Sequence, residues 1–162
     1  MKNRKKIQGM AIAAIIAAAY VVLTYLAAAL GLANGAIQIR LSEALTILPI
    51  FTPYAIPGLF IGCVLANLLT GCALWDILLG SLATLIGAVG TYLLRKYKFA
   101  SFIPPILSNT VIVPLVLMYV YSLNGSIWYF ALTIFIGEFI SCGILGFLLK
   151  KSIIKRNIFN KL

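Results

Sequence analysis

Three residues are the first candidates for binding chemistry in this chain, because they are its only acidic side chains. Glu43, Asp76 and Glu138 stand against thirteen Lys and Arg residues, and each lies at the edge of an apolar stretch or within one. An ionised side chain inside a membrane span costs roughly 2.5–3.5 kcal/mol on insertion scales, and such groups usually face a cavity or a partner. All three are therefore candidate binding residues. Glu43 and Asp76 also begin predicted helices, where a negative charge suits the helix dipole.

Further polar and aromatic residues lie close to these acids in the predicted arrangement of helices. Arg40 precedes Glu43 by three residues, so an ion pair between them is possible. Most of the set is expected near the outer ends of spans, with two members deeper. The predicted substrate-binding residues are Arg40, Glu43, Asn67, Trp75, Asp76, Asn109 and Glu138. Amides and carboxylates around an aromatic ring suit a small planar molecule with several hydrogen-bond donors, because each donor needs an acceptor once water is excluded.

Catalysis is not expected from this sequence. It has no His, no phosphate-binding Gly-x-x-x-x-Gly-Lys-Ser/Thr loop, no His-Glu-x-x-His pair and no Gly-x-Ser-x-Gly elbow. Cys63, Cys72 and Cys142 are irregularly spaced in apolar surroundings, so we interpret them as small packing residues rather than as a disulfide or a zinc site. We predict no catalytic residue, no metal and no cofactor.

The composition of the chain indicates a membrane protein, so the candidate residues must be positioned by membrane helices. Of the 162 residues, 63% are hydrophobic and only 10% are charged, whereas about a quarter are charged in soluble domains. The net charge of +10 could indicate nucleic acid, but twelve of the thirteen basic residues fall in three short clusters. This distribution indicates topology and contact with anionic lipid instead. The clusters are Lys2, Arg4, Lys5, Lys6; Arg95, Lys96, Lys98; and Lys150, Lys151, Lys155, Arg156, Lys161.

The positions of the basic clusters determine the predicted number of membrane spans, which is six. A span needs about 20 apolar residues, and four stretches qualify directly. Residues 41–69 are too long for one span and contain Pro49, Pro53 and Pro57, which favours two short helices broken at 52–54. If all three basic clusters are cytoplasmic, an even number of crossings separates them. We predict one all-α domain over residues 1–162 with both termini inside a prokaryotic plasma membrane, and helices at 7–30, 42–51, 55–69, 73–94, 102–121 and 127–149.

The first span has two open interpretations. Basic residues before an apolar run, and the small residues 27–29, resemble a cleaved signal peptide, but the run exceeds the usual core of about 7–15 residues. We expect a retained helix. Its small residues at 11, 14 and 18, like the Gly58-x-x-x-Gly62-x-x-x-Ala66 face of the third helix, allow close packing in lipid. The Gly58 face is expected to pack within the chain, whereas the stripe on the first helix serves either internal packing or a protein partner.

The motifs together resemble the QueT family over nearly the whole chain. The residues that carry this resemblance are, in order, Ile39-Arg40-Leu41-Ser42-Glu43-Ala44-Leu45, Gly58-Leu59-x-x-Gly62, Ala66-Asn67, Trp75-Asp76-x-x-x-Gly80-Ser81-Leu82-Ala83-Thr84 and Ser108-Asn109-Thr110. Members of this family are substrate-binding S components of energy-coupling factor (ECF) transporters.

The resemblance implies more than the composition does. It implies the six-helix ECF S-component fold, without an ATPase activity of its own, and partners in a transmembrane T subunit and two cytoplasmic ATPases. An Ala-x-x-x-Ala motif docks the first helix on the T subunit, and Ala14 and Ala18 match it best. The implied substrate is a queuosine precursor, a 7-deazaguanine base. We expect Glu138 or Glu43 to contact the base edge, Asp76 a cationic arm, Asn67 and Asn109 to act as amide partners, and Trp75 to stack.

Three alternatives stay open at this point. The chain could be an S component for another vitamin, since a few side chains set specificity. It could be an autonomous channel or a small holin-like protein, which would need a continuous polar stripe along the pore. A membrane enzyme would need a nucleophile or a metal pair, and the sequence shows neither.

Overall fold

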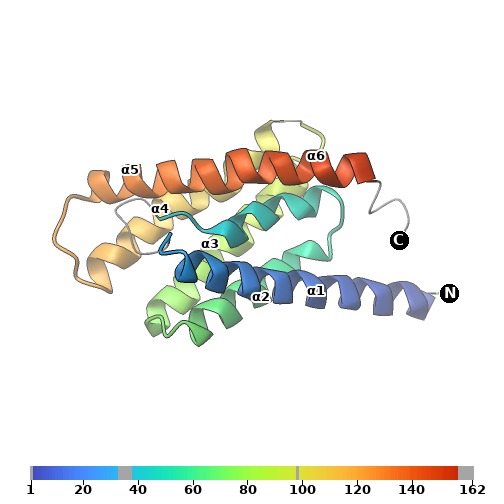
Figure 1. Cartoon of the computed structure of the whole chain (residues 1–162), viewed down its shortest axis with the longest axis horizontal. Coiled ribbons are helices and arrows are strands. Elements are labelled where there is room, and N and C mark those ends of the chain that lie inside the picture. The colour runs from blue at the N-terminus through green and yellow to red at the C-terminus, as the bar shows by residue number, and fades with distance from the viewer. Residues whose placement is uncertain (1, 33–37, 98, 157–162) are drawn as a thin grey trace.

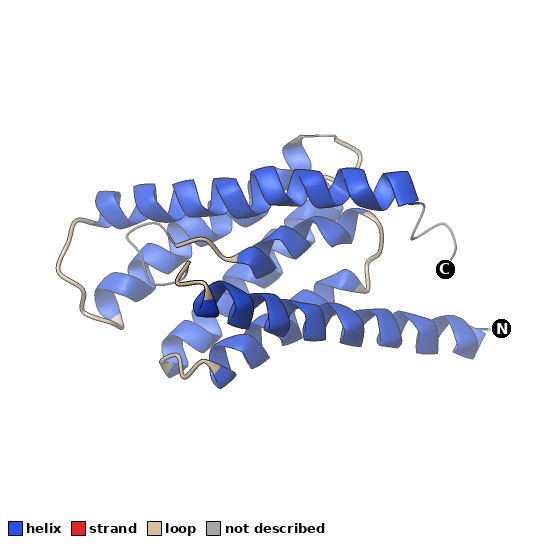
Figure 2. Cartoon of the chain, viewed as in Figure 1, coloured by secondary structure: helices blue, strands red, loops and turns tan. Residues whose placement is uncertain are grey.

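The chain folds into a bundle of helices, and no strand occurs in the described residues, which are 2–32, 38–97 and 99–156 of the computed structural model (Figures 1 and 2). Three elements differ from ordinary α-helix: η1 is a 3₁₀-helix of ten residues, η2 is a 3₁₀-helix of three, and η3 is a π-helix of seven. The elements are α1 (Lys2–Ala29), η1 (Leu41–Ile50), α2 (Ala55–Leu69), α3 (Leu74–Leu93), η2 (Ala100–Phe102), α4 (Ile103–Tyr119), α5 (Ile127–Glu138), η3 (Phe139–Leu145) and α6 (Gly146–Arg156).

Four helices are long and apolar enough to cross a membrane. They cover Asn3–Ala29, Leu74–Leu93, Ala100–Tyr119 and Ile127–Arg156, the last being α5, η3 and α6 in one continuous helix. With ten and fifteen residues, η1 and α2 reach only about 20 Å each, against a hydrocarbon core of about 30 Å. The predicted helix positions agree with the structure to within a few residues, except that α1 begins earlier and α6 ends later. The all-helical membrane class is confirmed, and the count of six spans stays a prediction.

Glycines bring α1 and α2 into close contact. A Cβ at Gly58 would lie 2.7 Å from the Ala13 carbonyl oxygen, and one at Gly62 would lie 3.0 Å from Ala17 Cα. Such approaches are typical of helix pairs that associate in lipid through small residues. The face of α1 that packs inside the chain is therefore the one with Ala13 and Ala17.

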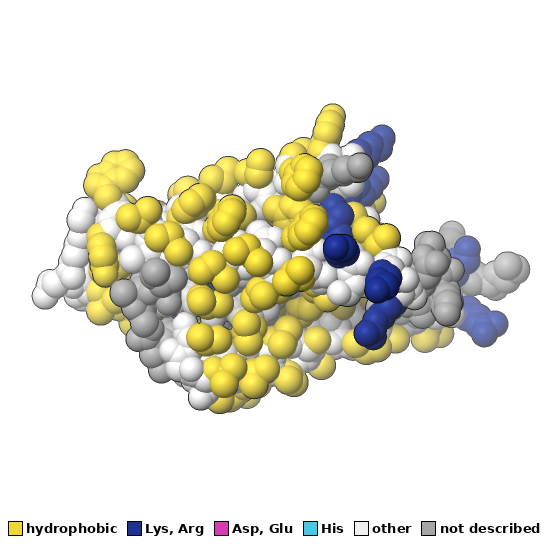
Figure 3. Space-filling view, turned by 45° about the horizontal axis from the view of Figure 1, so that its top comes forward, with side chains coloured by type: hydrophobic (Ala, Val, Ile, Leu, Met, Phe, Trp, Pro, Cys, Tyr) yellow, Lys and Arg dark blue, Asp and Glu magenta, His cyan; other side chains and the backbone are white. Residues whose placement is uncertain are grey.

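One end of the bundle is basic. The start of α1 and the end of α6 lie at this end of the long axis (Figure 1), and the Lys and Arg side chains on the face shown in Figure 3 gather there. The turn between η1 and α2, at residues 52–54, lies near the start of α1, since a Cβ at Gly9 would meet the Tyr54 ring. The positive-inside rule places this end in the cytoplasm, and that orientation stays a prediction. Lys98, Lys161 and residues 33–37 of the predicted outer loop lie outside the described residues.

Candidate functional site

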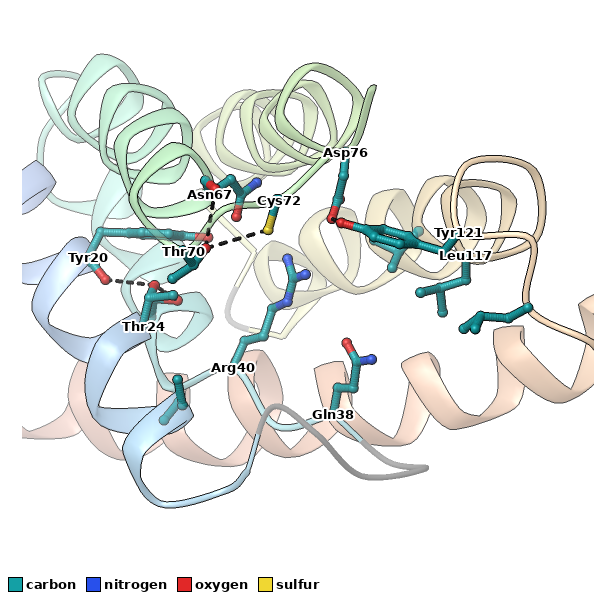
Figure 4. A pocket seen from close by; sticks show the side chains of 15 residues that line it. Tyr20, Thr24, Gln38, Arg40, Asn67, Thr70, Cys72, Asp76, Leu117 and Tyr121 are labelled. Atoms are coloured by element: carbon teal, nitrogen blue, oxygen red, sulfur yellow. Dashed lines mark hydrogen bonds between the residues drawn. The ribbon is translucent and has the colours of Figure 1, made fainter. Parts of the chain in front are cut away.

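A cavity of about 440 Å³ lies among the helix ends that are remote from the basic end (Figure 4). Its wall combines polar and apolar side chains from α1, α2, α3, the end of α4, and the segment before η1. The lining residues are Tyr20, Thr24, Ala27, Ala28, Gln38, Arg40, Ser42, Asn67, Thr70, Cys72, Asp76, Val113, Leu117, Tyr121 and Leu123. Its volume falls in the range of small-molecule sites, which is about 300–1,000 Å³.

Three of the predicted site residues line this cavity. The Arg40 side chain extends into its middle from the extended segment before η1 (Figure 4). Asn67 comes from the last turn of α2 and Asp76 from the first turn of α3, and both are buried. The short connection between α2 and α3 therefore brings an amide and a carboxylate to one wall, opposite a guanidinium.

Tyr121 fixes the orientation of the Asp76 carboxylate. Its hydroxyl donates a hydrogen bond of 2.8 Å to Asp76 Oδ2 and lies 3.2 Å from the amide nitrogen of Ala73. Burial, reinforced by the Asp76 carboxylate and opposed by the Ala73 amide, raises the pKa of Tyr121 to about 12. The phenol therefore keeps its proton at neutral pH and acts as a donor to Asp76.

Gly80 gives the two polar side chains their room. A Cβ at this position would lie 3.3 Å from both Asn67 Nδ2 and Asp76 Oδ1. Tyr121 bonds to Oδ2, so Oδ1 is the carboxylate oxygen that we assign to a ligand. Asn67 Nδ2 is directed at Cys63 Sγ, at 3.7 Å, and its amide and the Asp76 carboxylate both border Gly80.

The other predicted polar residues, Glu43, Asn109 and Glu138, form a separate buried group. Cys142, which was predicted only to pack, joins them, and we name these four residues the acidic cluster. Side-chain ligand atoms of Glu43, Glu138 and Cys142 all lie within 4.8 Å of one another. Cys142 Sγ is 3.2 Å from Glu138 Oε2 and 3.4 Å from the carbonyl oxygen of Glu43. Asn109 faces both carboxylates, yet neither of its amide atoms reaches a partner with hydrogen-bond geometry.

Tyr20 separates the acidic cluster from the cavity. Its ring lines the cavity, and its hydroxyl donates to Glu43 Oε1, which Thr84 Oγ1 also approaches, at 3.4 Å. Glu43 is completely buried, and among the described contacts these donors take the place of the possible pair with Arg40, whose charge acts on it through space. The acidic cluster is therefore a layer behind the cavity wall.

Two uncommon helix types meet at the acidic cluster. Glu43 belongs to the 3₁₀-helix η1, and Cys142 to the π-helix η3 that directly follows Glu138. Runs of 3₁₀-helix beyond three or four residues are uncommon, and π-helical turns are frequent at functional sites. Thr46 Oγ1, one turn along η1, lies 3.4 Å from Cys142 Sγ, so the two helices are in direct contact here.

Trp75 is the predicted site residue that the structure does not bring to the cavity. Its side chain is 61% exposed on the surface of the bundle, and it is absent from the cavity wall. Successive residues of a helix point about 100° apart, so the face that turns Asp76 inward turns Trp75 outward. This corrects the expected stacking of Trp75 on a ligand.

Several cavity residues carry no clear signal in the sequence. Tyr20 and Thr24 lie on an alanine-rich helix, four residues apart and hence on one face. Thr24 Oγ1 donates to Tyr20 O and lies 3.0 Å from Ser42 Oγ, which has a proton of its own to donate. Tyr121 follows α4 in a turn. In the sequence, Tyr20, Thr24 and Tyr121 look like ordinary polar residues near the ends of membrane spans. Only the folded structure shows that they line the same cavity.

Gly137 supports the segment that carries Arg40, and its replacement is our first prediction. A Cβ at Gly137 would meet the carbonyl oxygen of Gln38, and backbone cannot move aside as a flexible side chain can. We expect Gly137→Ala to lower the free energy of unfolding by about 1–3 kcal/mol through overpacking, and to weaken ligand binding by displacing Arg40.

A matched control lies one and a half turns further along the same helix. At Gly143 a Cβ would approach its nearest neighbour, the Phe139 ring, at 3.6 Å, which is ordinary contact. Thermal unfolding and calorimetric binding of both variants check the prediction. Equal behaviour of Gly137→Ala and Gly143→Ala would show that the Gln38 contact does not position Arg40.

An all-helical membrane protein with a cavity of mixed polar and apolar lining among several helix ends fits the class of membrane carriers and their solute-binding subunits. The chain matches the model of the QueT transporter family over residues 10–155 and belongs to that family. The resemblance inferred from the motifs is thereby confirmed, and the chain is placed among transporters.

A curated relative agrees with this placement. The queuosine precursor transporter QueT of Lactococcus lactis subsp. cremoris (strain MG1363) is 35% identical over 86 residues, which are 52% of this chain and 50% of the relative. The match thus spans about half the length of that relative. No solved structure matches the chain.

Proposed function

We propose that this chain is the substrate-binding subunit of an ECF-type transporter and binds a 7-deazaguanine queuosine precursor in the cavity. The observation that carries the proposal is the cavity itself, in which Arg40, Asn67 and Asp76 converge in a member of the QueT transporter family. The name of the relative, a queuosine precursor transporter, supports this substrate class.

The polar groups of the cavity complement the edge of a guanine-like base. Such an edge presents ring and exocyclic N–H donors beside a carbonyl acceptor. We assign the donors to the Asp76 carboxylate, which Tyr121 orients, and the carbonyl to Arg40, whose guanidinium donates in a fixed plane. Asn67 offers a further amide contact. Apolar side chains such as Val113 and Leu117 cover the faces of the ring.

The acidic cluster contributes to this site from behind its wall. The predicted contact of Glu43 or Glu138 with the base edge requires the Tyr20 ring to move, because Tyr20 lies between the cavity and Glu43. We therefore propose that Glu43, Asn109 and Glu138 act on the substrate through the position of Tyr20. Their direct contact with the base stays a prediction.

The proposed partners are a transmembrane T subunit and two cytoplasmic ATPases that drive uptake into the cell. Ala14 and Ala18 of α1 are exposed, while their neighbours Ala13 and Ala17 pack on α2. The exposed alanines leave a smooth strip of helix on which another helix can pack closely. We propose this strip as the docking site for the T subunit.

Direct binding to the purified chain in detergent tests the function. We expect calorimetry to show tight binding of one 7-deazaguanine base and none of thiamine, riboflavin or biotin. Calorimetry suits this protein better than tryptophan quenching, because Trp75 and Trp128 are 61% and 81% exposed and away from the cavity wall. Binding of a control vitamin would keep the subunit class and replace the substrate, and binding of no ligand would contradict the proposal.

A further inference from the structure

The acidic cluster has acceptor atoms that no protein donor satisfies. Glu43 Oε2 and Asn109 Oδ1 are both buried without a hydrogen-bond partner, and Asn109 is only 1% exposed. Leaving a buried polar atom unpaired costs about 1–3 kcal/mol, and more where a charge is involved. Asn109 Nδ2 is unpartnered as well, and the two ends of an Asn amide exchange places by rotation of the group. With the amide oxygen turned toward the carboxylates, the unpaired oxygens together favour a group that accepts electron pairs.

The charge of the acidic cluster also favours a bound cation. Glu43 and Glu138 bring two carboxylates together, at 0% and 5% exposure, in the apolar interior of a membrane protein. Arg40 is the basic side chain that acts on both through space. Two adjacent buried carboxylates cannot both stay ionised without compensation. One guanidinium balances one of them, and either a proton or a single cation can neutralise the other.

The spacing and the chemistry of the donors define the size and type of that charge. The nearest carboxylate oxygens of Glu43 and Glu138 lie within 4.8 Å of each other, and Asn109 faces both. This separation fits around an ion whose bonds to oxygen are about 2.4 Å, as for Ca²⁺ and for Na⁺, which has a similar radius. Carboxylate and amide oxygens are hard ligands that favour such ions over soft metals. Cys142 lies within hydrogen-bond distance of Glu138, so we treat its thiol as a donor to that ligand rather than as a thiolate.

We propose that the acidic cluster binds one small monovalent cation, Na⁺ by size, through Glu43, Glu138 and the Asn109 carbonyl oxygen. The site lies behind Tyr20, whose hydroxyl bonds to Glu43, and is distinct from the cavity that Arg40 and Asp76 line. It departs from the prediction from sequence, which expected no metal because the chain has no His and its cysteines are irregularly spaced. The proposal does not depend on the identity of the substrate.

The test is the thermal unfolding midpoint of the full chain in detergent, with NaCl replacing choline chloride at constant ionic strength. A ligand that binds only the folded state stabilises it in proportion to the logarithm of its concentration. We expect Na⁺ to raise the midpoint by about 5–10 °C at a hundredfold excess over its dissociation constant. A midpoint that is equal in NaCl and choline chloride would overturn the proposal.

Two variants localise the effect. Glu138→Gln removes one carboxylate and the repulsion with Glu43, so it should fold, and we expect it to lose the response to Na⁺. Trp75→Phe changes an exposed side chain that lies outside both the cavity wall and the cluster, and it should keep the response. If Glu138→Gln still responds in full, or if Trp75→Phe abolishes the response, the ion does not bind at the acidic cluster.

A third variant tests the geometry by a gain of function. Asn109→Asp places a third carboxylate beside the pair, so a divalent ion of the same size becomes the better match for the charge. We expect CaCl₂ to stabilise Asn109→Asp more than it stabilises the unmodified chain. The absence of this gain, in a variant that folds, would count against Asn109 as a ligand.

Discussion

Replacing Asp76 by Asn is expected to lower the affinity for the 7-deazaguanine ligand by about 10- to 150-fold. A hydrogen bond to a charged group contributes about 1.5–3 kcal/mol, and each 1.4 kcal/mol is a factor of ten in affinity. The amide also presents its own N–H donors to the donors of the base. The side chain is 6% exposed, so water cannot restore the lost interaction. Calorimetric titration of the purified variant measures the effect.

Two neighbouring substitutions serve as controls for Asp76→Asn. Tyr121→Phe keeps the carboxylate and removes only the donor that orients it, so we expect a smaller loss, of about 2- to 10-fold. Trp75→Phe changes the adjacent exposed residue and should leave the affinity unchanged. If Asp76→Asn binds as tightly as Trp75→Phe, Asp76 does not contact the ligand.

The second large effect concerns assembly. We expect Ala18→Leu or Ala14→Leu to abolish copurification with the T subunit while the thermal midpoint and the ligand affinity of the isolated chain stay unchanged. Both alanines are exposed, so leucine finds space in lipid but obstructs the close approach of a second helix. Affinity purification of the tagged chain, coexpressed with the T subunit and ATPases, gives the readout.

Ala17 provides the matched comparison on the same helix. It is buried, and its Cα would lie 3.0 Å from a Cβ at Gly62. Leucine there would force α1 and α2 apart, so Ala17→Leu should lower the stability of the isolated chain by about 1–3 kcal/mol or more. A normal yield of complex with both Ala14→Leu and Ala18→Leu would show that the exposed strip is not the docking site.

The sequence predicts the helices of this protein well, because prolines and apolar length mark their ends. The pair of short helices on either side of residues 52–54 follows from Pro49, Pro53 and Pro57, and the structure has η1 and α2 at these positions. The 3₁₀ and π geometries of η1 and η3 could not be predicted from the sequence. The two helices contact each other through Thr46 and Cys142, which are 96 residues apart, and local sequence patterns carry no information on such a contact.

The sequence places some of the candidate residues at the cavity and misplaces others, because it does not show how far each side chain lies from the cavity wall. Arg40, Asn67 and Asp76 line the cavity, as their positions at outer helix ends suggest. Trp75 points away, and Glu43, Asn109 and Glu138 lie behind Tyr20, because the rotation of each helix about its axis depends on its neighbours. Hydrophobic periodicity indicates that rotation poorly here, where nearly every position is apolar.

The burial of all three acidic side chains leaves the exterior with charges of one sign. The chain has three acids and no His, and Glu43, Asp76 and Glu138 are each at most 6% exposed. Since these three residues are the acidic side chains of the chain, every exposed charged side chain among the described residues is a Lys or an Arg. Copies of the purified chain in detergent are therefore expected to repel one another, and added salt should screen this repulsion.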